Sequence, residues 1–427
     1  MNRRQLFGLG AGVVAVLQSD AIQKIQAATK TLGNMAVEEA AMDEDFWFQV
    51  RHAFTVDRNI INLNNGGVSP SPRPVQDAAR HYQEFSDMGP SHHMWRTLTP
   101  NLEPVRRELA RTFGADPEEI AITRNASEAL EAAILGVDLK AGDEVITTNQ
   151  DYPRMRTTWY QRARREGIVI KEAKFPVPPP SMDYLVKIVE DQITPRTKVI
   201  SLCHITNLSG QIFPIKRICD MARQKGIFTI IDGAHAFAQW PYTRDELGCD
   251  AYGSSLHKWL TAPIGTGFLY VKRDRIKDVW PLMAASKGQT EDIRKFEEIG
   301  THPAANRNAI SEALVFHHSI GGDRKAARLR YLRARWTNRL RKYPQVKLFT
   351  SDDPEQSCGI GLVGVEGIES GKIVSHLYDK WRIVTTPAGT RGEYSGIRVT
   401  PNVYSTLQDV DTFADAMEEV LTKGLPG

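Results

Sequence analysis

The chain of 427 residues is long enough to bury a large core and to form about two or three domains. Hydrophobic residues make up 41% of it and charged residues 25%, and the net charge of +3 is too small to indicate binding to nucleic acid or to a membrane surface. Cys203, Cys219, Cys249 and Cys358 have no paired spacing, so the sequence predicts neither a disulfide framework nor a zinc site. Cys203 and Cys219 lie in apolar or helical stretches and are expected to be buried, inert thiols.

Residues 1–28 have the pattern of a targeting peptide. Arg3-Arg4 precedes a short apolar run over 6–17, and small residues follow around Ala27-Ala28. The run is too short to span a bilayer, and the paired arginines are typical of a twin-arginine signal, which directs the export of folded proteins. We therefore expect a periplasmic or extracytoplasmic protein with no stable membrane insertion of the mature chain. The alternative is an attached amphipathic helix on a cytoplasmic protein.

Apolar strands alternate with amphipathic helices in the first two thirds of the chain. This alternation predicts βαβ units and a mostly parallel sheet, in which ligands bind at the carboxyl ends of the strands. Tyr152, Asn207 and Asp232 each follow or end a predicted strand, so we expect them to share a site. The predicted strands are 145–148, 198–205, 228–232 and 267–272, and helices are predicted at 153–166, 182–193 and 215–225.

The alternation stops near Ala304. A long helical run to Tyr343 is followed by strand-like pieces at 359–365 and 396–400 and by a final helix over 407–423. We expect a large domain over 61–303 and a smaller α+β domain over 304–427, against which the N-terminal segment 29–60 packs. The arginines within 324–342 share their helix with regularly spaced leucines and a tryptophan, so they are interpreted as a solvated face.

Two segments carry groups that suit pyridoxal phosphate (PLP). Asp232 ends an apolar strand, and Lys258 lies in the run Ser254 to Trp259, soon followed by the glycine-rich stretch 265–267. A lysine that forms a Schiff base and an aspartate that pairs with a pyridinium nitrogen are the two protein groups that PLP chemistry needs most. The two segments together therefore predict a PLP site.

A helix start after the predicted strand 120–122 offers a place for the cofactor's phosphate. Asn125 or Ser127 is a suitable N-cap for an amphipathic helix that runs to Val137. Capping alone would explain these residues. Beside the lysine and aspartate segments, however, the free N–H groups of this helix start favour a phosphate-binding role.

Six motifs occur in the order seen in class V aminotransferases, a family of fold-type I PLP enzymes, and the chain resembles that family over residues 45–425. The resemblance is greatest to the isopenicillin N epimerase branch, where an Asp-Gly-Ala-His run and a Gly-Thr pair such as Gly300-Thr301 are expected. It implies an α/β fold with a mainly parallel seven-stranded sheet in the large domain, a smaller α+β C-terminal domain and a homodimer. The motifs are 62–67, 123–129, 204–210, 232–235, 255–258 and 396–401.

The resemblance also implies roles for individual residues. Lys258 would form the Schiff base with PLP, and Asp232 would face the pyridine nitrogen. Arg398 would hold the substrate carboxylate, and Tyr152 would stack on the ring, where many relatives have histidine. The other cofactor-binding residues that it implies are Asn125, Ala126, Ser127, Asn207, His235, Ser255, His257 and Thr301, the last of these reaching into a partner subunit's site.

These residues place the chemistry at Cα of an amino acid but leave the reaction open. With Lys258 as the base, returning the proton to the opposite face of Cα gives epimerisation, for which Tyr152 or His235 are candidate second acids. Returning the proton to the cofactor gives transamination, and loss of a β- or γ-substituent gives a lyase. The segment 383–396 has no cysteine where cysteine desulfurases carry their nucleophile, so a persulfide relay is disfavoured while C–S cleavage without one stays open.

A PLP-fold protein that binds a ligand without catalysis is the alternative from another functional class. The presence of Lys258, Asp232 and Arg398 together argues against it. The adjacent pairs His92-His93 and His317-His318 have no matching carboxylate or cysteine set, so no metal site is predicted. The expected partners are a small amino-acid substrate and a second copy of the chain, with no nucleic acid.

Overall fold

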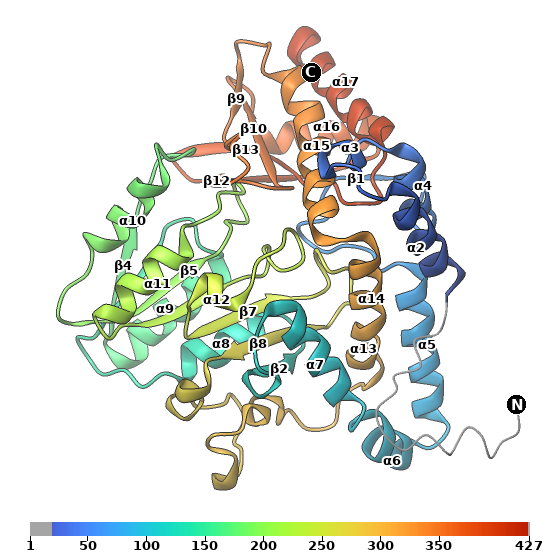
Figure 1. Ribbon diagram of the computed structural model, residues 1–427. Coiled ribbons are helices and arrows are strands. Elements are labelled where there is room, and N and C mark those ends of the chain that lie inside the picture. Colours follow the sequence, from blue (N-terminus) through green and yellow to red (C-terminus); the bar gives the residue numbers. More distant parts are fainter. Residues whose placement is uncertain (1–18, 426–427) are drawn as a thin grey trace, which may run out of the picture.

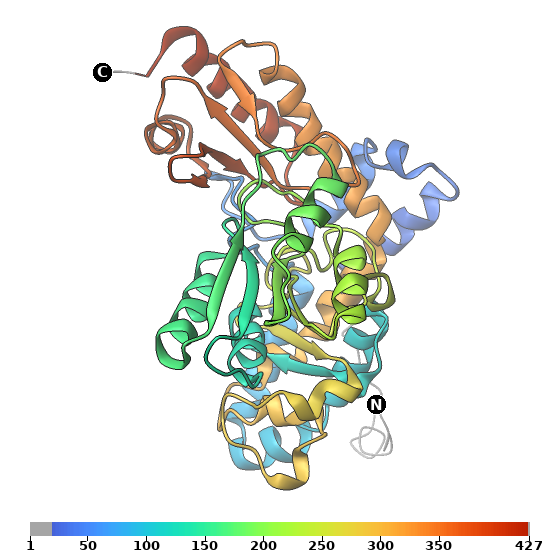
Figure 2. The same ribbon diagram turned by 90° about the vertical axis from the view of Figure 1, so that its left-hand side faces the viewer.

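The computed structural model describes residues 19–425, which form a large α/β body and a smaller domain beyond it (Figures 1 and 2). Arg3-Arg4 and the apolar run of the predicted signal lie outside the described residues. Helix α2 (Asp20–Leu32) buries Ile22 and Ile25 and packs on α4 (Glu44–His52), so that Ala27-Ala28 lies inside a helix. Within residues 19–425, no helix is both long and apolar enough to cross a membrane.

The large domain contains the predicted seven-stranded, mainly parallel sheet. Its strand order is β2-β8-β7-β6-β5-β3-β4, and β8 alone runs antiparallel to its two neighbours. The carboxyl ends of β3, β5, β6 and β7 therefore meet along one edge of the sheet. The strands are β2 (Ile120–Thr123), β3 (Glu144–Thr148), β4 (Val169–Ala173), β5 (Thr197–Cys203), β6 (Phe228–Asp232), β7 (Ala251–Ser255) and β8 (Gly267–Val271).

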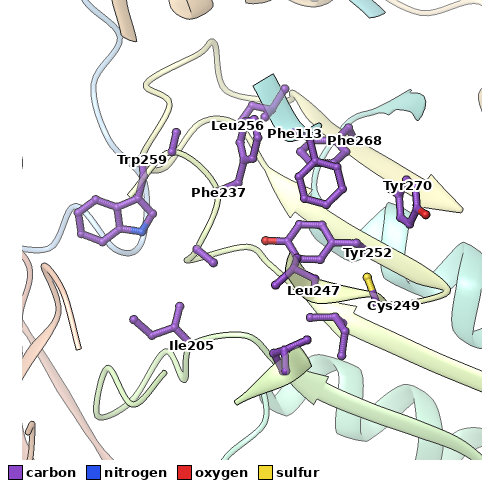
Figure 3. Packing of buried hydrophobic residues seen from close by; sticks show 14 of the residues in the cluster. Phe113, Ile205, Phe237, Leu247, Cys249, Tyr252, Leu256, Trp259, Phe268 and Tyr270 are labelled. Carbon is purple, nitrogen blue, oxygen red and sulfur yellow. The ribbon is translucent and has the colours of Figure 1, made fainter. Parts of the chain in front are cut away.

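Side chains alternate along the strands between two hydrophobic cores, one on each face of the sheet. On β8, Phe268 belongs to one core and Leu269 to the other. Phe113 of α7 packs on the first face, with ring centroids 4.8 Å from Tyr252 and 5.3 Å from Phe268 (Figure 3). The helices that cover the faces are α7 (Leu102–Phe113), α8 (Ala126–Gly136), α9 (Pro153–Glu166), α10 (Met182–Glu190) and α11 (Ile215–Gln224).

The smaller domain is an antiparallel sheet of order β12-β13-β10-β9 covered by helices. A separate short parallel pair joins β1 (Ile61–Asn62), far upstream in the chain, to β11 (Ile383–Val384). The elements of this domain are β9 (Val346–Leu348), β10 (Gly361–Val365), β12 (Thr386–Thr390), β13 (Tyr394–Val399), α16 (Ser370–Trp381) and α17 (Leu407–Lys423).

The helical run predicted from Ala304 to Tyr343 is divided into α13 (Ala305–Asn308), α14 (Ile310–Ile320) and α15 (Gly322–Leu340). The run is helical as predicted but is interrupted between α14 and α15 at Gly321, whose φ of 90° an α-helix cannot accommodate. Along α15, Leu329 belongs to the core of the large domain and Trp336 to that of the small domain. This helix therefore joins the two cores, and the predicted boundary at 303/304 stays a prediction.

The N-terminal segment packs on the helices that join the two domains. Helix α3 (Val37–Ala40) contacts α15, and α2 contacts α14. Phe54, which follows α4, shares a small hydrophobic cluster with Phe316 of α14 and with Tyr404, which precedes α17. The other helices before the sheet are α5 (Arg73–Asp87), α6 (Pro90–His93) and a short π-helical turn (Met94–Leu98), and α12 (Arg244–Leu247) follows β6.

Candidate functional site

A cavity of about 180 Å³ lies at the carboxyl ends of β3, β5, β6 and β7. All the site residues predicted from the sequence line it, except Thr301 and Arg398. Arg398 is hydrogen bonded to Asn207 in the cavity wall, whereas Thr301 lines a separate hollow with Trp95 and Arg307. A single chain therefore assembles the predicted site without Thr301, whose predicted role across a subunit interface stays a prediction.

Lys258 lies in the loop that follows β7, with its amine directed at a histidine. Its Nζ atom is 3.0 Å from Nε2 of His235. Desolvation lowers the pKa of the amine to about 8, with the nearby Asp232 carboxylate opposing this shift and Arg398 adding to it. Burial and the charge of Lys258 also hold the pKa of His235 well below its usual range, so the imidazole is neutral and its Nε2 accepts a hydrogen bond from the amine.

Asp232, at the end of β6, is a buried carboxylate with few donors around it. One oxygen accepts a hydrogen bond from the backbone N–H of Ala234 at 2.9 Å, and the Sγ atom of Cys203 lies 3.9 Å from the other. Burial raises the pKa of this carboxyl to about 6, although the Ala234 N–H and the charge of Lys258 act against that rise. A cationic group bound in the cavity would favour the ionised carboxylate, as a protonated pyridine ring does.

A second buried carboxylate, Asp151, braces the strand ends, and the sequence reasoning did not identify it. It accepts hydrogen bonds from the hydroxyl of Thr147 at 2.8 Å, from the N–H of Thr148 at 2.6 Å and from the N–H of Cys203 at 2.5 Å. It thereby joins the ends of β3 and β5 next to Tyr152, the residue that precedes α9. In the sequence, only its position directly before the expected site residue Tyr152 pointed to Asp151, because its partner Cys203 is distant along the chain.

The N-terminus of α8 forms the end of the cavity that suits a phosphate. Asn125 caps the helix by accepting the N–H of Glu128 at 2.9 Å, and the hydroxyl of Ser255 accepts the N–H of Ala126 at 2.9 Å. Gly267 on β8 permits this arrangement, since a Cβ atom there would lie 2.6 Å from Cα of Asn125. Backbone N–H groups at a helix start bind phosphate well.

Arg398, on β13 of the small domain, is 8% exposed. Its Nη1 atom donates to the carbonyl of Asn207 at 2.9 Å, and Nη2 donates to Oδ1 of Asn64 at 2.8 Å. Burial lowers the pKa of the guanidinium to about 10, and no carboxylate among residues 19–425 forms an ion pair with it. A buried cation with only neutral partners is suited to bind a ligand carboxylate.

The comparisons with known proteins identify the family. Residues 61–413 match the model of the family described as aminotransferase class-V. The chain belongs to the class V aminotransferase family. An isopenicillin N epimerase from Amycolatopsis lactamdurans is 30% identical over 393 residues, which cover 88% of this chain and 98% of that protein. A cysteine desulfurase from Haloferax volcanii is 23% identical, with coverage of 84% and 89%.

Solved structures confirm that this class V chain has the fold-type I architecture. A cysteine desulfurase from Thermococcus onnurineus superposes with a TM-score of 0.77 at 22% identity, covering 90% of this chain and 98% of that one. The cystine C–S lyase C-DES, in complex with its product cysteine persulfide, gives a TM-score of 0.72 at 22% identity, covering 84% and 97%. The family and these neighbours are PLP-dependent enzymes.

The polar groups of the cavity fit PLP. The amine of Lys258 and the carboxylate of Asp232 suit the aldehyde and the pyridine nitrogen, and the start of α8 suits the phosphate. Oδ1 of Asn207 and the Nδ1 atoms of His235 and His257 are buried, yet they have no hydrogen-bond partner among the residues described. Buried polar atoms are rarely left unpaired, so these groups are available to a ligand.

Replacing Asp232 with asparagine should change how the stability of the cofactor-free protein depends on pH. The raised pKa means that folding favours the protonated carboxyl, so wild-type stability is lost as the pH rises from about 4 to about 6. Asparagine does not ionise and escapes this loss. Between roughly pH 3.5 and pH 7, denaturant unfolding should show the variant gaining about 3 kcal/mol relative to wild type. Parallel stability curves would contradict the raised pKa.

Proposed function

We propose that this class V chain is a PLP-dependent enzyme that acts at Cα of an amino acid, as an epimerase or an aminotransferase. The supporting observation is that Lys258 and Asp232 line one cavity and that Arg398 donates a hydrogen bond to Asn207 in its wall. The amine of Lys258 matches the aldehyde of PLP, and the carboxylate of Asp232 matches its ring nitrogen. The guanidinium of Arg398, which has no anionic partner among the described residues, matches the substrate carboxylate. Bound PLP would withdraw electrons from Cα of an amino acid attached to it.

The protein's own groups then have distinct tasks. Lys258 is poised to move a proton at Cα, because an amine with a pKa of about 8 is partly neutral near neutral pH. The Asp232 carboxylate would keep the ring nitrogen protonated, which favours electron withdrawal. Arg398 would fix the substrate by its carboxylate and so decide which bond at Cα is exposed to Lys258. The start of α8 and Ser255 would hold the phosphate.

The relationship to isopenicillin N epimerases supports epimerisation as the first reaction to test. Epimerisation needs a second acid on the face of Cα opposite the first base. Nε2 of His235 contacts the amine of Lys258, so these two groups act on the same side. Tyr152 comes from a different strand end, lines the same cavity and is 39% exposed, so it is the better candidate for the second acid.

Two other functions give different outcomes in the same assays. A lyase that eliminates a β-substituent or cleaves a C–S bond would release ammonia, sulfide or a persulfide, and the fold shared with C-DES motivates this alternative. A protein that binds PLP without catalysis would show the cofactor's absorbance but no exchange at Cα. The partly neutral amine of Lys258 and the unpaired Arg398 favour catalysis over binding alone.

We further propose that the protein is exported in folded form and acts as a homodimer. The paired arginines Arg3-Arg4 at the start of the chain motivate export by the twin-arginine route. The dimer would supply Thr301 to the partner's site, consistent with its place in a hollow separate from the cavity of its own chain. Trp95 and Ile264, which are 58% and 68% exposed, offer apolar area for such an interface.

Purified protein incubated with PLP should develop a visible absorption band. Borohydride should then reduce the Schiff base and leave the cofactor covalently linked to the protein. Lys258→Ala should bind PLP only reversibly, because no amine remains to form the Schiff base. Lys225→Ala is the matched control, since this lysine is exposed on the surface. Absorbance after dialysis and the intact mass after reduction would measure both effects. A wild-type protein that stays colourless and unmodified would overturn the cofactor assignment.

A panel of L- and D-amino acids in heavy water should reveal deuterium incorporation at Cα. Inversion, keto-acid formation and release of ammonia or sulfide would distinguish epimerase, aminotransferase and lyase. Asp232→Ala should slow the exchange by about a hundredfold or more, because the electrostatic partner of the ring nitrogen is lost. Mass spectrometry and chiral chromatography give the rates. Exchange at the wild-type rate in this variant would refute the role of Asp232.

Tyr152→Phe should separate exchange from inversion. The ring is retained but the acidic hydroxyl is lost, so inversion of an amino acid should fall about a hundredfold. Deuterium exchange without inversion should persist, because Lys258 acts on its own side of Cα. Equal inversion rates for Tyr152→Phe and wild type would exclude Tyr152 as the second acid.

A further inference from the structure

We propose that Asn64 orients Arg398 and thereby sets the affinity of the site for the α-carboxylate of an amino acid. Asn64 is a positioning residue in this proposal, acting on the substrate through the guanidinium. The inference rests on the proposed function, because it concerns the substrate that the function requires.

The contact between Asn64 and Arg398 brings together residues 334 positions apart. Oδ1 of Asn64 accepts a hydrogen bond from Nη2 at 2.8 Å, while the carbonyl of Asn207 accepts one from Nη1 at 2.9 Å. These two acceptors fix the plane of the guanidinium from two sides. The Nε–H of Arg398 is buried and has no partner among the described residues, so this donor is available to a ligand.

The segment that carries Asn64 is itself held rigidly against the small domain. Asn64 forms a parallel β-bridge with Thr400, two residues beyond Arg398. The N–H of Thr400 donates to the carbonyl of Leu63 at 2.7 Å, and the N–H of Asn64 donates to Oδ1 of Asn62 at 3.0 Å. The backbone at Asn64 is therefore held in place, which limits how far its side-chain amide can move away from the guanidinium.

The same segment reaches the loop of Lys258. The N–H of Ser69 donates to the carbonyl of His257 at 3.0 Å, next to the lysine. A Cβ atom on Gly66 would lie 3.3 Å from Cε1 of His235, so the segment passes close to the histidine that contacts Lys258. The position of the proposed carboxylate-binding arginine is in this way linked to the position of the lysine amine. A bound amino acid would have to reach both groups at once.

The choice of an amide at position 64 matters because it is a neutral acceptor. An aspartate there would offer a similar oxygen to Arg398 but would form a permanent ion pair with it. A substrate carboxylate would then have to compete with that internal anion. Asn64 supplies the hydrogen bond that orients the guanidinium and leaves its charge to the ligand.

The test uses PLP-loaded wild type, Asn64→Ala, Asn64→Asp and the control Asn59→Ala, which changes an exposed asparagine. Each is titrated with the amino acid that exchanges fastest in heavy water and with the corresponding amine that lacks the carboxyl group, such as ethylamine for alanine. The cofactor's absorbance change gives an apparent Kd for each ligand, and thermal unfolding checks that each variant is folded.

Asn64→Ala should weaken binding of the amino acid about tenfold to a hundredfold, the usual effect of losing a hydrogen bond to a charged group. Its affinity for the amine should stay within about twofold of wild type, because the amine does not use Arg398. Asn64→Asp should weaken amino-acid binding at least as much as Asn64→Ala, even though an acceptor oxygen is restored. Asn59→Ala should match wild type with both ligands.

Two results would overturn the proposal. Wild-type affinity for the amino acid in Asn64→Asp would show that Asn64 serves only as a structural acceptor. Equal loss of amino-acid and amine affinity in Asn64→Ala would show a general disturbance of the cavity. If Asn64→Ala does not fold, the affinities of Asn64→Asp for the amino acid and for the amine decide between the proposal and these two alternatives. Failure of the proposed function is a separate outcome, in which the wild-type protein exchanges no amino acid at all.

Discussion

The structure depends on burying three charged groups, Lys258 and Asp232 of the large domain and Arg398 of the small domain, close to one cavity without a direct ion pair. Within residues 19–425, none of the three lies within ion-pair distance of an opposite charge. Desolvation shifts each pKa in the direction that favours the neutral group. It lowers the pKa of the lysine to about 8 and that of the arginine to about 10, and it raises that of the aspartate to about 6. Such unbalanced charges reduce stability in the empty protein and are typical of sites that a ligand completes.

The rest of the fold supplies neutral partners that hold these charges in place. His235 accepts from Lys258, the Ala234 N–H donates to Asp232, and Asn64 accepts from Arg398. Because the lysine and the arginine lie in different domains, their separation depends on the connections between the domains. Helix α15, whose side chains enter both cores, provides one connection. The hairpin β12–β13 provides another, because Glu393 accepts both hydrogen bonds of the Asn149 amide at 2.9 Å, just before Tyr152.

Much of this arrangement could be predicted from local sequence patterns. The boundaries of β6, α9 and α17 agree with the prediction, because apolar periodicity and Pro or Gly at their ends are local signals. β7 was not predicted as a strand because Ala251–Ser255 is composed largely of small residues. Its Gly253 packs beneath Leu130 of α8, where a Cβ atom would lie 2.7 Å from Cγ of that leucine. A small residue chosen to admit a neighbouring helix has no apolar signature of its own.

The site was predictable to the extent that its residues stand in recognisable motifs. Lys258, Asp232 and the start of α8 belong to that group, and the structure places them around one cavity. The hydrogen bonds from Cys203 to Asp151 and from Arg398 to Asn64 could not be predicted, because each joins residues that are far apart in the sequence. Such contacts are set by the relative position of strand ends and domains, which no local pattern of the chain encodes.

The cysteines bear on which reaction this arrangement can support. All four are buried, and Cys203 alone lines the cavity, where its thiol faces Asp232. Burial and the carboxylates of Asp151 and Asp232 raise the pKa of this thiol well above its usual range, so it stays protonated and is a poor nucleophile. A relay that moves sulfur through a reactive cysteine is therefore disfavoured by electrostatics as well as by the sequence of 383–396. In the proposed reaction, Lys258 would take the proton from Cα on one side and Tyr152 would donate one from the neighbouring wall, so these two groups would decide among the remaining reactions.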